Sequence, residues 1–230
     1  PAGVLNYLWD ETGLGFASGT VALNLEQSYE KIFSTQFSSK NRNMINKGEK
    51  TLYIEYGTSI EDYKIFIPMY QYTMKRLNAE KYYHFSNQFF NNISNILSNH
   101  CFVFVAYDVQ TSTPFGSLLL LIYKNKAHYF LSARSHLSKN NSINNFLLNN
   151  AISFSKKKNC SIFHLGGGNS MDDNDSLFKF KKNFSTDVYD FFISKNVIHS
   201  AIYNSVCEIW EKRNPGKSQQ FKNYLLRYHE

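Results

Sequence analysis

A run of three glycines, Gly166–Gly168, follows an apolar stretch that contains His164, and these residues are the best suited to chemistry. Glycine has no side chain, so three in succession leave the peptide N–H and C=O groups open to a ligand and allow positive φ. An Asp/Asn-rich turn comes next, followed by a basic and aromatic segment at 176–184. Together these segments could hold an extended anionic or amide-bearing ligand. The competing interpretation is a flexible strand-to-helix connection with a solvated lysine face.

Residues 176–184 are predicted to form a helix with a lysine beside its apolar side. Leu177, Phe180 and Phe184 recur at i, i+3 and i+7, the spacing of a buried helical stripe. Lys181 lies at the edge of this stripe, so we expect its amine to border a cleft.

His164 is the candidate general base, because an imidazole with an unperturbed pKa of about 6.5 suits proton transfer at neutral pH. A hydrogen-bonded structural histidine is the alternative. Asp172, Asp173 and Asp175 could bind an amine or a metal, but an Asp/Asn run before a helix is more simply a turn and an N-cap. We therefore predict no metal site.

Composition limits the number of domains and the kinds of partner that the chain can have. The chain has 230 residues, of which 43% are hydrophobic, enough for one large domain or one domain with an extension. A net charge of +7 and a pI near 9.1 favour acidic partners. These partners include the phosphates of a cofactor, a nucleotide-linked substrate, RNA and an anionic membrane surface.

The cysteines and the apolar runs indicate the cellular compartment in which the protein is expected. Cys101, Cys160 and Cys207 lie among apolar residues without the short pair spacing of a zinc or redox site. We expect buried free thiols and a reducing, cytoplasmic location. The longest apolar run, 115–123, is too short to cross a bilayer and is typical of a buried strand, and the first residues do not resemble a signal peptide.

Periodicity predicts a mixed α/β fold with helices on both faces of a sheet. Strands are predicted at 20–25, 51–56, 102–107, 115–123, 127–133, 161–165 and 188–194. Helices are predicted at 28–37, within 37–50, after Ser59, after Ser86, after Ser142, at 176–184 and at 198–210. Short polar turns make the three strands between 102 and 133 an antiparallel meander. A helix then leads to 161–165, so this strand should lie parallel to 127–133 in a βαβ unit.

This order of elements resembles a GNAT-type acyltransferase domain, and more specifically the peptidoglycan-bridge aminoacyltransferases of the FemABX family and their single-domain relatives. The matching motifs occur in the family's order from about residue 37 to residue 196. They are Lys40-x-Arg42-Asn43-x-Ile45-x-Lys47, Tyr70-x-x-Thr73-x-x-Arg76, Gly166-Gly167-Gly168 and Leu177-x-x-Phe180-Lys181-x-x-Phe184. The resemblance implies a GNAT-like domain at 37–230, with 1–36 as a lead-in segment that could be the remnant of an upstream domain.

The resemblance implies an N-acyltransferase. FemABX enzymes that use aminoacyl-tRNA carry two GNAT-like domains, whereas this chain holds one, so an acyl-CoA, in the first place acetyl-CoA, is the expected donor. The expected acceptor is a small-molecule amine: that of a sugar, a nucleotide-linked sugar or a cell-wall precursor. The alternatives are an aminoacyl-tRNA-dependent transferase acting on a peptidoglycan precursor and a non-catalytic GNAT-like module that binds a polyanion such as RNA.

The GNAT arrangement also implies where the donor lies. The third strand of the meander and the parallel strand after it splay apart, and the donor's pyrophosphate lies near the start of the following helix. The implied donor-binding residues are Arg134, Ser135, Lys139, Asn140, Asn141 and Ser142. A helix N-terminus with nearby cations suits phosphate. The glycine-rich loop usual in GNAT enzymes is absent, since 132–142 contains no glycine.

The remaining motifs are assigned to catalysis and to the acceptor. His164 and Lys181 are the candidate catalytic residues. The candidate acceptor-binding residues are Arg42, Lys47, Arg76, Gly166, Gly167, Gly168 and Phe180. Arg42 and Lys47 would flank a cleft entrance, and Arg76 would pair with a carboxylate or support the acceptor pocket. A surface salt bridge is the competing explanation for Arg76.

Overall fold

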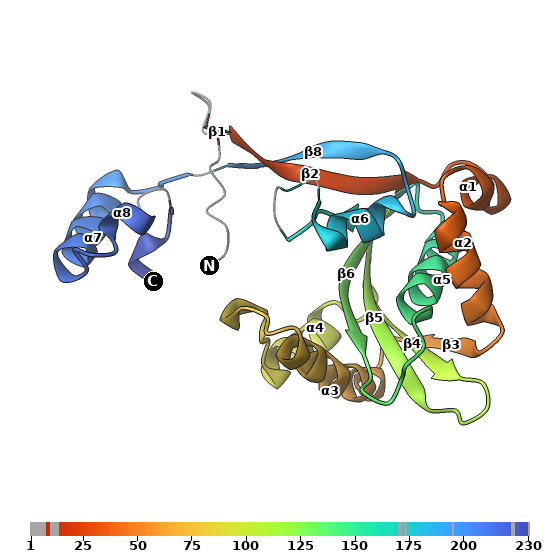
Figure 1. The fold of residues 1–230 in the computed structure, drawn as a ribbon. Coiled ribbons are helices and arrows are strands. Elements are labelled where there is room, and N and C mark those ends of the chain that lie inside the picture. The colour runs from red at the N-terminus through yellow and green to blue at the C-terminus, as the bar shows by residue number, and fades with distance from the viewer. Residues whose placement is uncertain are drawn as a thin grey trace. The chain divides into compact units, whose positions relative to one another are not determined.

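The computed structural model describes residues 8–9, 14–169, 172, 174–194, 196–221 and 224–229 (Figure 1). The chain divides into two compact units. The larger unit comprises residues 20–189, and the smaller one is formed by residues 3–19 together with 190–230. Each unit is described by itself below.

A mixed sheet forms the centre of the larger unit, with the strand order β2-β7-β6-β5-β4-β3. The strands are β2 (Leu14–Asn24), β3 (Leu52–Gly57), β4 (Cys101–Asp108), β5 (Pro114–Tyr123), β6 (Lys126–Arg134) and β7 (Ile162–Gly166). Strands β3 to β6 are antiparallel neighbours, β7 lies parallel to β6, and β2 is antiparallel to β7. The predicted meander and the predicted parallel strand are both confirmed.

Helices cover both faces of this sheet, as the continuously apolar β5 predicts. On one face, α1 (Tyr29–Thr35), α2 (Ser39–Glu49), α5 (Ile143–Lys157) and α6 (Ser176–Lys182) contribute to one hydrophobic core. On the other face, α3 (Ile60–Arg76) and α4 (Asn87–Ile96) build a second core. Leu118 and Leu120 of β5 point into the first core and Leu119 into the second, because side chains alternate along a strand.

Local sequence signals set the ends of the helices. Ser59 and Asp62 form a complete capping box at the start of α3, and Ser86 caps α4. Ser142 does not cap α5 with its side chain as predicted; its hydroxyl and its backbone N–H both donate to Asn140 Oδ1. The reason is the backbone of Ser142, whose φ of −86° and ψ of −7° are helical rather than the extended angles of an N-cap residue. Ile96, the last residue of α4, is 77% exposed.

The smaller unit contains β1 (Leu8–Trp9), paired with β2 at residues 15–16, and most of β8 (Val188–Ser194), which also pairs with β2. It continues with α7 (Ser200–Arg213), α8 (Ser218–Phe221) and a 3₁₀ segment at Arg227–His229. Another 3₁₀ segment, Lys81–Tyr83, belongs to the larger unit. Cys207 and Trp210 of α7 are buried, and Arg227 forms an ion pair with Glu211 at 3.0 Å.

All three cysteines are free and buried. Among the described residues, no helix has the length and apolar character needed to cross a membrane. The boundary placed at residue 37 stays a prediction. Residues 20–24 of the predicted lead-in nevertheless lie in β2, which pairs with β7.

Candidate functional site

The site is built where β6 and β7 separate. The two strands pair at Lys126–Ile162, Ala127–Phe163 and His128–His164. Beyond the histidine pair β6 continues beside β5 to Arg134, whereas β7 follows β2 and ends at Gly166 opposite Val21. We call this separation the fork. It is the splay that the GNAT resemblance implies, and its closed end is the histidine pair.

Three side chains from three strands form a hydrogen-bonded row at the closed end of the fork. His164 Nε2 lies 2.7 Å from Thr20 Oγ1 on β2, and His164 Nδ1 lies 2.7 Å from His128 Nδ1 on β6. Phe163 and Leu165 point into the first core, so His164 points to the opposite face of the sheet. The imidazole rings are stacked, with centroids 4.8 Å apart.

The geometry of the row restricts its protonation. One Nδ1 must donate to the other, so the two histidines cannot both carry protons on these atoms. Burial, together with the charges of His164 and Lys181, lowers the pKa of His128 to about 4, while a hydrogen bond with the His164 backbone partly opposes this shift. Burial, with the charge of Lys181, also lowers the pKa of His164. Both rings are therefore neutral at pH 7.

Lys181 reaches the fork from α6. Its side chain is buried, with 8% of its surface exposed, and Nζ donates to the Gly167 carbonyl at 2.6 Å. Nζ also lies 5.8 Å from the centre of the Tyr129 ring on β6. Burial lowers the pKa of Lys181 to about 8, and the Asp175 carboxylate partly opposes this. The amine is thus a largely protonated cation in a poorly solvated position.

The three glycines hold the loop close to α6. Gly166 has φ +82°, and a Cβ there would lie 3.1 Å from Lys181 Nζ. A Cβ on Gly168 would lie 2.6 Å from Asp175 Oδ1. Asp175 caps α6 by accepting from Phe178 N at 2.8 Å, and its other oxygen accepts from Asn169 N at 3.1 Å. The Asp/Asn turn therefore supplies the N-cap, while Asp173 lies outside the described residues.

The predicted donor-binding residues lie at the last position of β6 and in the loop between β6 and α5. The Arg134 guanidinium donates to the Asn140 carbonyl at 2.6 Å and to the Ser138 carbonyl at 3.4 Å. Ser135 is buried, and its hydroxyl accepts from Leu137 N at 3.2 Å. Lys139 and Asn141 are exposed, whereas Ser142 is buried.

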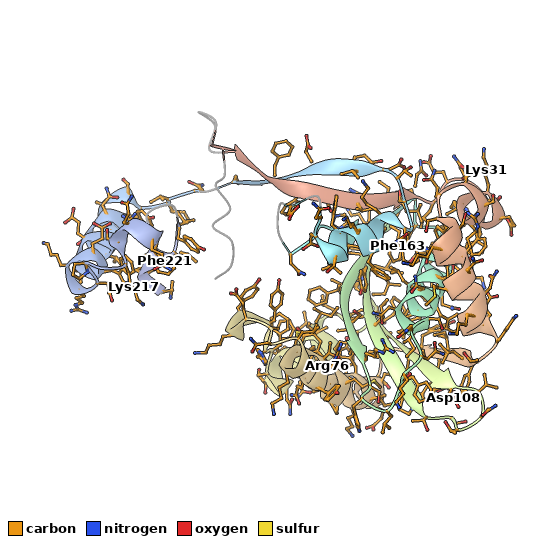
Figure 2. The ribbon with its side chains drawn as sticks, viewed as in Figure 1. Lys31, Arg76, Asp108, Phe163, Lys217 and Phe221 are labelled. Carbon is orange, nitrogen blue, oxygen red and sulfur yellow. The ribbon has the colours of Figure 1, made fainter. Side chains whose placement is uncertain are left out.

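A cavity of about 240 Å³ joins this loop to the end of α3. Its lining residues are Tyr72, Arg76, Arg134, Ser135, His136 and Ser138. Arg76, labelled in Figure 2, is the last residue of α3. Burial lowers the pKa of Arg134, and the nearby charge of Arg76 adds to this effect. Two guanidinium groups in one cavity favour a ligand with two negative charges.

The other predicted acceptor-binding residues lie apart from this arrangement. The Arg42 guanidinium donates to the carbonyls of Ser34 and Phe37 and so holds the turn between α1 and α2. Lys47 is exposed on α2. The Phe180 ring packs against the first core, 5.5 Å from Phe184. The structure thus gathers His164, Lys181 and the glycines, and separately Arg76 with Arg134 and Ser135.

Sequence reasoning missed Thr20, His128 and Tyr129. Each is unremarkable in its own strand, and each gains its place only from the register of β2, β7 and β6. The predicted parallel pairing of 127–133 with 161–165 was the available signal, because it already brought His128 close to His164. Among the described residues, no three His, Cys, Asp or Glu side chains are grouped as metal ligands.

No protein-family model matches the sequence, and no curated protein sequence matches it. Solved structures do match. FemX aligns over 83% of this chain and 64% of its own length, with a TM-score of 0.67 and 12% identity. The chain has the FemABX-like GNAT-type fold.

Two further structures with the FemABX-like GNAT-type fold align over most of the chain. The C-terminal domain of a putative lysylphosphatidylglycerol synthetase from Agrobacterium fabrum aligns over 84% of this chain and 65% of its own, with a TM-score of 0.55 and 14% identity. L-PGS from Bacillus licheniformis aligns over the same shares, with a TM-score of 0.56 and 11% identity. The chain thus spans less than two thirds of each of these structures.

Proposed function

We propose that the chain is an acyltransferase that moves an aminoacyl group from an aminoacyl-tRNA to the amine of a cell-envelope precursor. This is the alternative that the FemABX resemblance raised, and it now takes precedence over acetyl transfer from acetyl-CoA. Two kinds of neighbour support it: FemX, and a putative lysylphosphatidylglycerol synthetase, whose name denotes the making of an aminoacylated lipid. Such low identities establish the fold alone, so the activity rests on the site.

The observation that carries the proposal is the position of Lys181. A buried ammonium group with a pKa of about 8 is held by the Gly167 carbonyl at the fork, 2.6 Å away. Acyl transfer creates negative charge on the carbonyl oxygen and then on the leaving oxygen. A fixed cation in a site of low dielectric stabilises such charge far better than one in water.

The reaction needs no covalent nucleophile on the protein. The neutral amine of the acceptor forms a C–N bond to the ester carbonyl, the electron pair moves to the carbonyl oxygen, and its return breaks the ester C–O bond. The ribose oxygen gains one proton and the attacking nitrogen loses one. Lys181, as an acid with a pKa of about 8, suits donation of a proton to the leaving oxygen.

The histidine row suits removal of the proton from the attacking nitrogen. Both imidazoles are neutral at pH 7, and His128, with a pKa of about 4, is a weak base that can hold the proton only transiently before passing it to solvent. His164 uses its two ring nitrogens within the row, so a proton reaches it only through Thr20 or His128. In this proposal His128 accepts the proton, and His164 and Thr20 act through it as positioning residues.

The test is transfer from a mixed pool of aminoacyl-tRNA to a panel of amines, including amino sugars, nucleotide-linked amino sugars and lysine-containing peptides, with mass spectrometry of the products. Wild type should form amides, Lys181→Met should lose at least 100-fold in rate, and Lys182→Met should retain the wild-type rate. Lys182 is the matched control because it is the neighbouring residue and is exposed. Equal rates for the two variants would remove Lys181 from the mechanism.

The cavity with Arg76 and Arg134 favours a second candidate, transfer from an acyl-CoA. Arg134 follows His128 by six residues along β6, a span of about 20 Å. A long, thin donor could lie in the fork with its acyl group at the histidine pair and its phosphates in this cavity. Thermal stabilisation by acetyl-CoA that is lost in Arg76→Gln and Arg134→Gln, at fixed salt, would favour this donor. Stabilisation that persists in both variants would place the phosphates elsewhere.

A further inference from the structure

We propose that a lysine-rich edge of the larger unit binds the phosphate backbone of RNA. The lysine edge is defined by Lys124, Lys126, Lys156, Lys157 and Lys158. This inference rests on the proposed function, for which it supplies the surface that holds the single-stranded, acylated 3′ end of an aminoacyl-tRNA.

Hydrogen bonds join the two segments that carry these lysines. Lys124 and Lys126 flank Asn125 in the turn between β5 and β6, while the other three lie at the end of α5. The Asn125 carbonyl accepts from Ser161 N at 2.8 Å, and its amide donates to Ser161 Oγ at 3.0 Å. Ser161 lies between α5 and β7, directly before the strand. The two groups of lysines therefore meet at the same end of the sheet.

The positive charge of the lysine edge is available to a ligand. All of its lysines except Lys156 are exposed, and Lys156 Nζ donates to the Leu25 carbonyl at 2.8 Å. The ion pairs found among the described residues, Glu61–Lys64 and Glu211–Arg227, do not involve these lysines. Glu26, next to Leu25, carries a negative charge that offsets part of the positive charge of the lysine edge.

Exposed aromatic rings border the lysine edge on two sides. Tyr123 is 65% exposed, and Lys124 Nζ lies 5.5 Å from its ring centre. Tyr56 is 58% exposed and packs on Phe154 with ring centres 4.7 Å apart, and Lys158 Nζ lies 5.4 Å from the Phe154 ring. Lysines that follow a backbone and tyrosines on which bases stack are the combination used for single-stranded nucleic acid.

The lysine edge lies close to the chemistry. Lys126 precedes His128 by two residues on the same face of β6, which is about 7 Å along the strand. A donor whose phosphates contact the lysine edge can therefore place its acyl end at the fork. Turn asparagines at 125 and 159 add amide donors for phosphate and ribose oxygens.

A lipid surface would instead favour several apolar side chains that insert into it. Next to this turn one aliphatic side chain, Ile162, is 41% exposed, so the lysine edge fits a nucleic acid better than a membrane.

The test is the salt-dependent binding of fluorescently labelled, deacylated total transfer RNA, followed by anisotropy. The edge variant replaces Lys124, Lys126, Lys157 and Lys158 with glutamine. The control variant replaces the exposed Lys40, Lys50, Lys81 and Lys182 with glutamine, which removes the same charge elsewhere. We expect the edge variant to bind at least tenfold more weakly than the control at about 0.1 M salt. Its log–log salt slope should be flatter by about 1 for each phosphate that the edge no longer neutralises.

Equal affinity in the two variants, with both folded by their melting temperatures, would overturn the inference. Sedimentation with phosphatidylglycerol vesicles is the second arm. An edge variant that loses vesicle binding while keeping its affinity for transfer RNA would assign the edge to a membrane and also overturn it. The binding assay needs no transfer reaction. Edge-dependent binding without turnover would therefore refute the proposed function alone, and turnover with equal binding would refute the edge alone.

Discussion

His128 Nδ1 and His164 Nδ1 lie 2.7 Å apart across the last paired position of β6 and β7. At that distance one nitrogen must carry a hydrogen and the other must not, so the contact exists only while the pair is not fully protonated. The same two residues mark where the strands part. Their protonation is thus tied both to the stability of the fork and to any proton transfer within it.

The histidine pair predicts a stability that falls as the pH falls. The pKa of His128 is about 4 in the folded protein and about 6.5 unfolded, so the unfolded chain binds more protons between these values. The free energy of unfolding should drop between about pH 6.5 and pH 4, on the order of 1–3 kcal/mol from this residue. Urea unfolding at several pH values measures it. In His128→Asn the drop should be smaller; an unchanged drop would assign it to other groups.

Lys181→Met should abolish most of the activity and raise the melting temperature at pH 7. Burying the charged Lys181 side chain destabilises the folded protein, as its lowered pKa indicates. A methionine of similar length removes this desolvation penalty, and it also removes the cation that the reaction needs. Calorimetry and the transfer assay, run on the same preparation, measure the two effects. Joint loss of stability and activity would mean that Lys181 is structural.

The pH–rate profile should decline on the alkaline side near the pKa of Lys181. The ammonium form is lost as the pH rises through about 8, and with it the stabilisation of the leaving oxygen. Initial rates across the range from neutral to clearly alkaline pH, at saturating acceptor, provide the measurement. A profile that keeps rising well above the pKa of Lys181 would contradict a protonated Lys181.

Gly166→Ala should lower both stability and activity. The residue has φ +82°, which costs a side chain about 1 kcal/mol, and the new Cβ would come within 3.1 Å of Lys181 Nζ. Gly216→Ala is a suitable control, because no atom lies within 4 Å of a Cβ built there. If Gly166→Ala has the same stability and activity as this control, neither property requires the close approach of the loop to Lys181.

Thr20→Val should leave His164 Nε2 without its partner while keeping the shape of the side chain. The hydroxyl lies 2.7 Å from that nitrogen, and only Thr20→Ser should restore it. We expect the acidic limb of the pH–rate profile to shift in the valine variant and to return in the serine variant. An acidic limb that is the same in all three proteins would remove the row from proton transfer.

Much of the fold followed from local patterns. The capping box of Ser59 and Asp62, the apolar runs with short polar turns in β4 to β6 and the apolar stripe of α5 each act within a few residues, so their elements were predicted close to their observed bounds. The loop before α5 was harder, because the helical backbone angles of Ser142 and the two bonds that it donates to Asn140 Oδ1 depend on how the whole loop packs.

In the candidate site, too, some residues could be found from local sequence and others only from the tertiary structure. Residue types and spacing singled out the glycines, His164 and Lys181, since bare backbone, a titratable ring and a lysine beside an apolar stripe are visible in one segment. Other parts of the site depend on contacts between residues that are distant in the sequence. His128 lies 36 positions from His164, and Thr20 lies 144 positions from it. Arg76 and Arg134, which line one cavity, are 58 positions apart. Strand register and the approach of α3 to the β6–α5 loop set those contacts, and both are settled by packing of the whole larger unit.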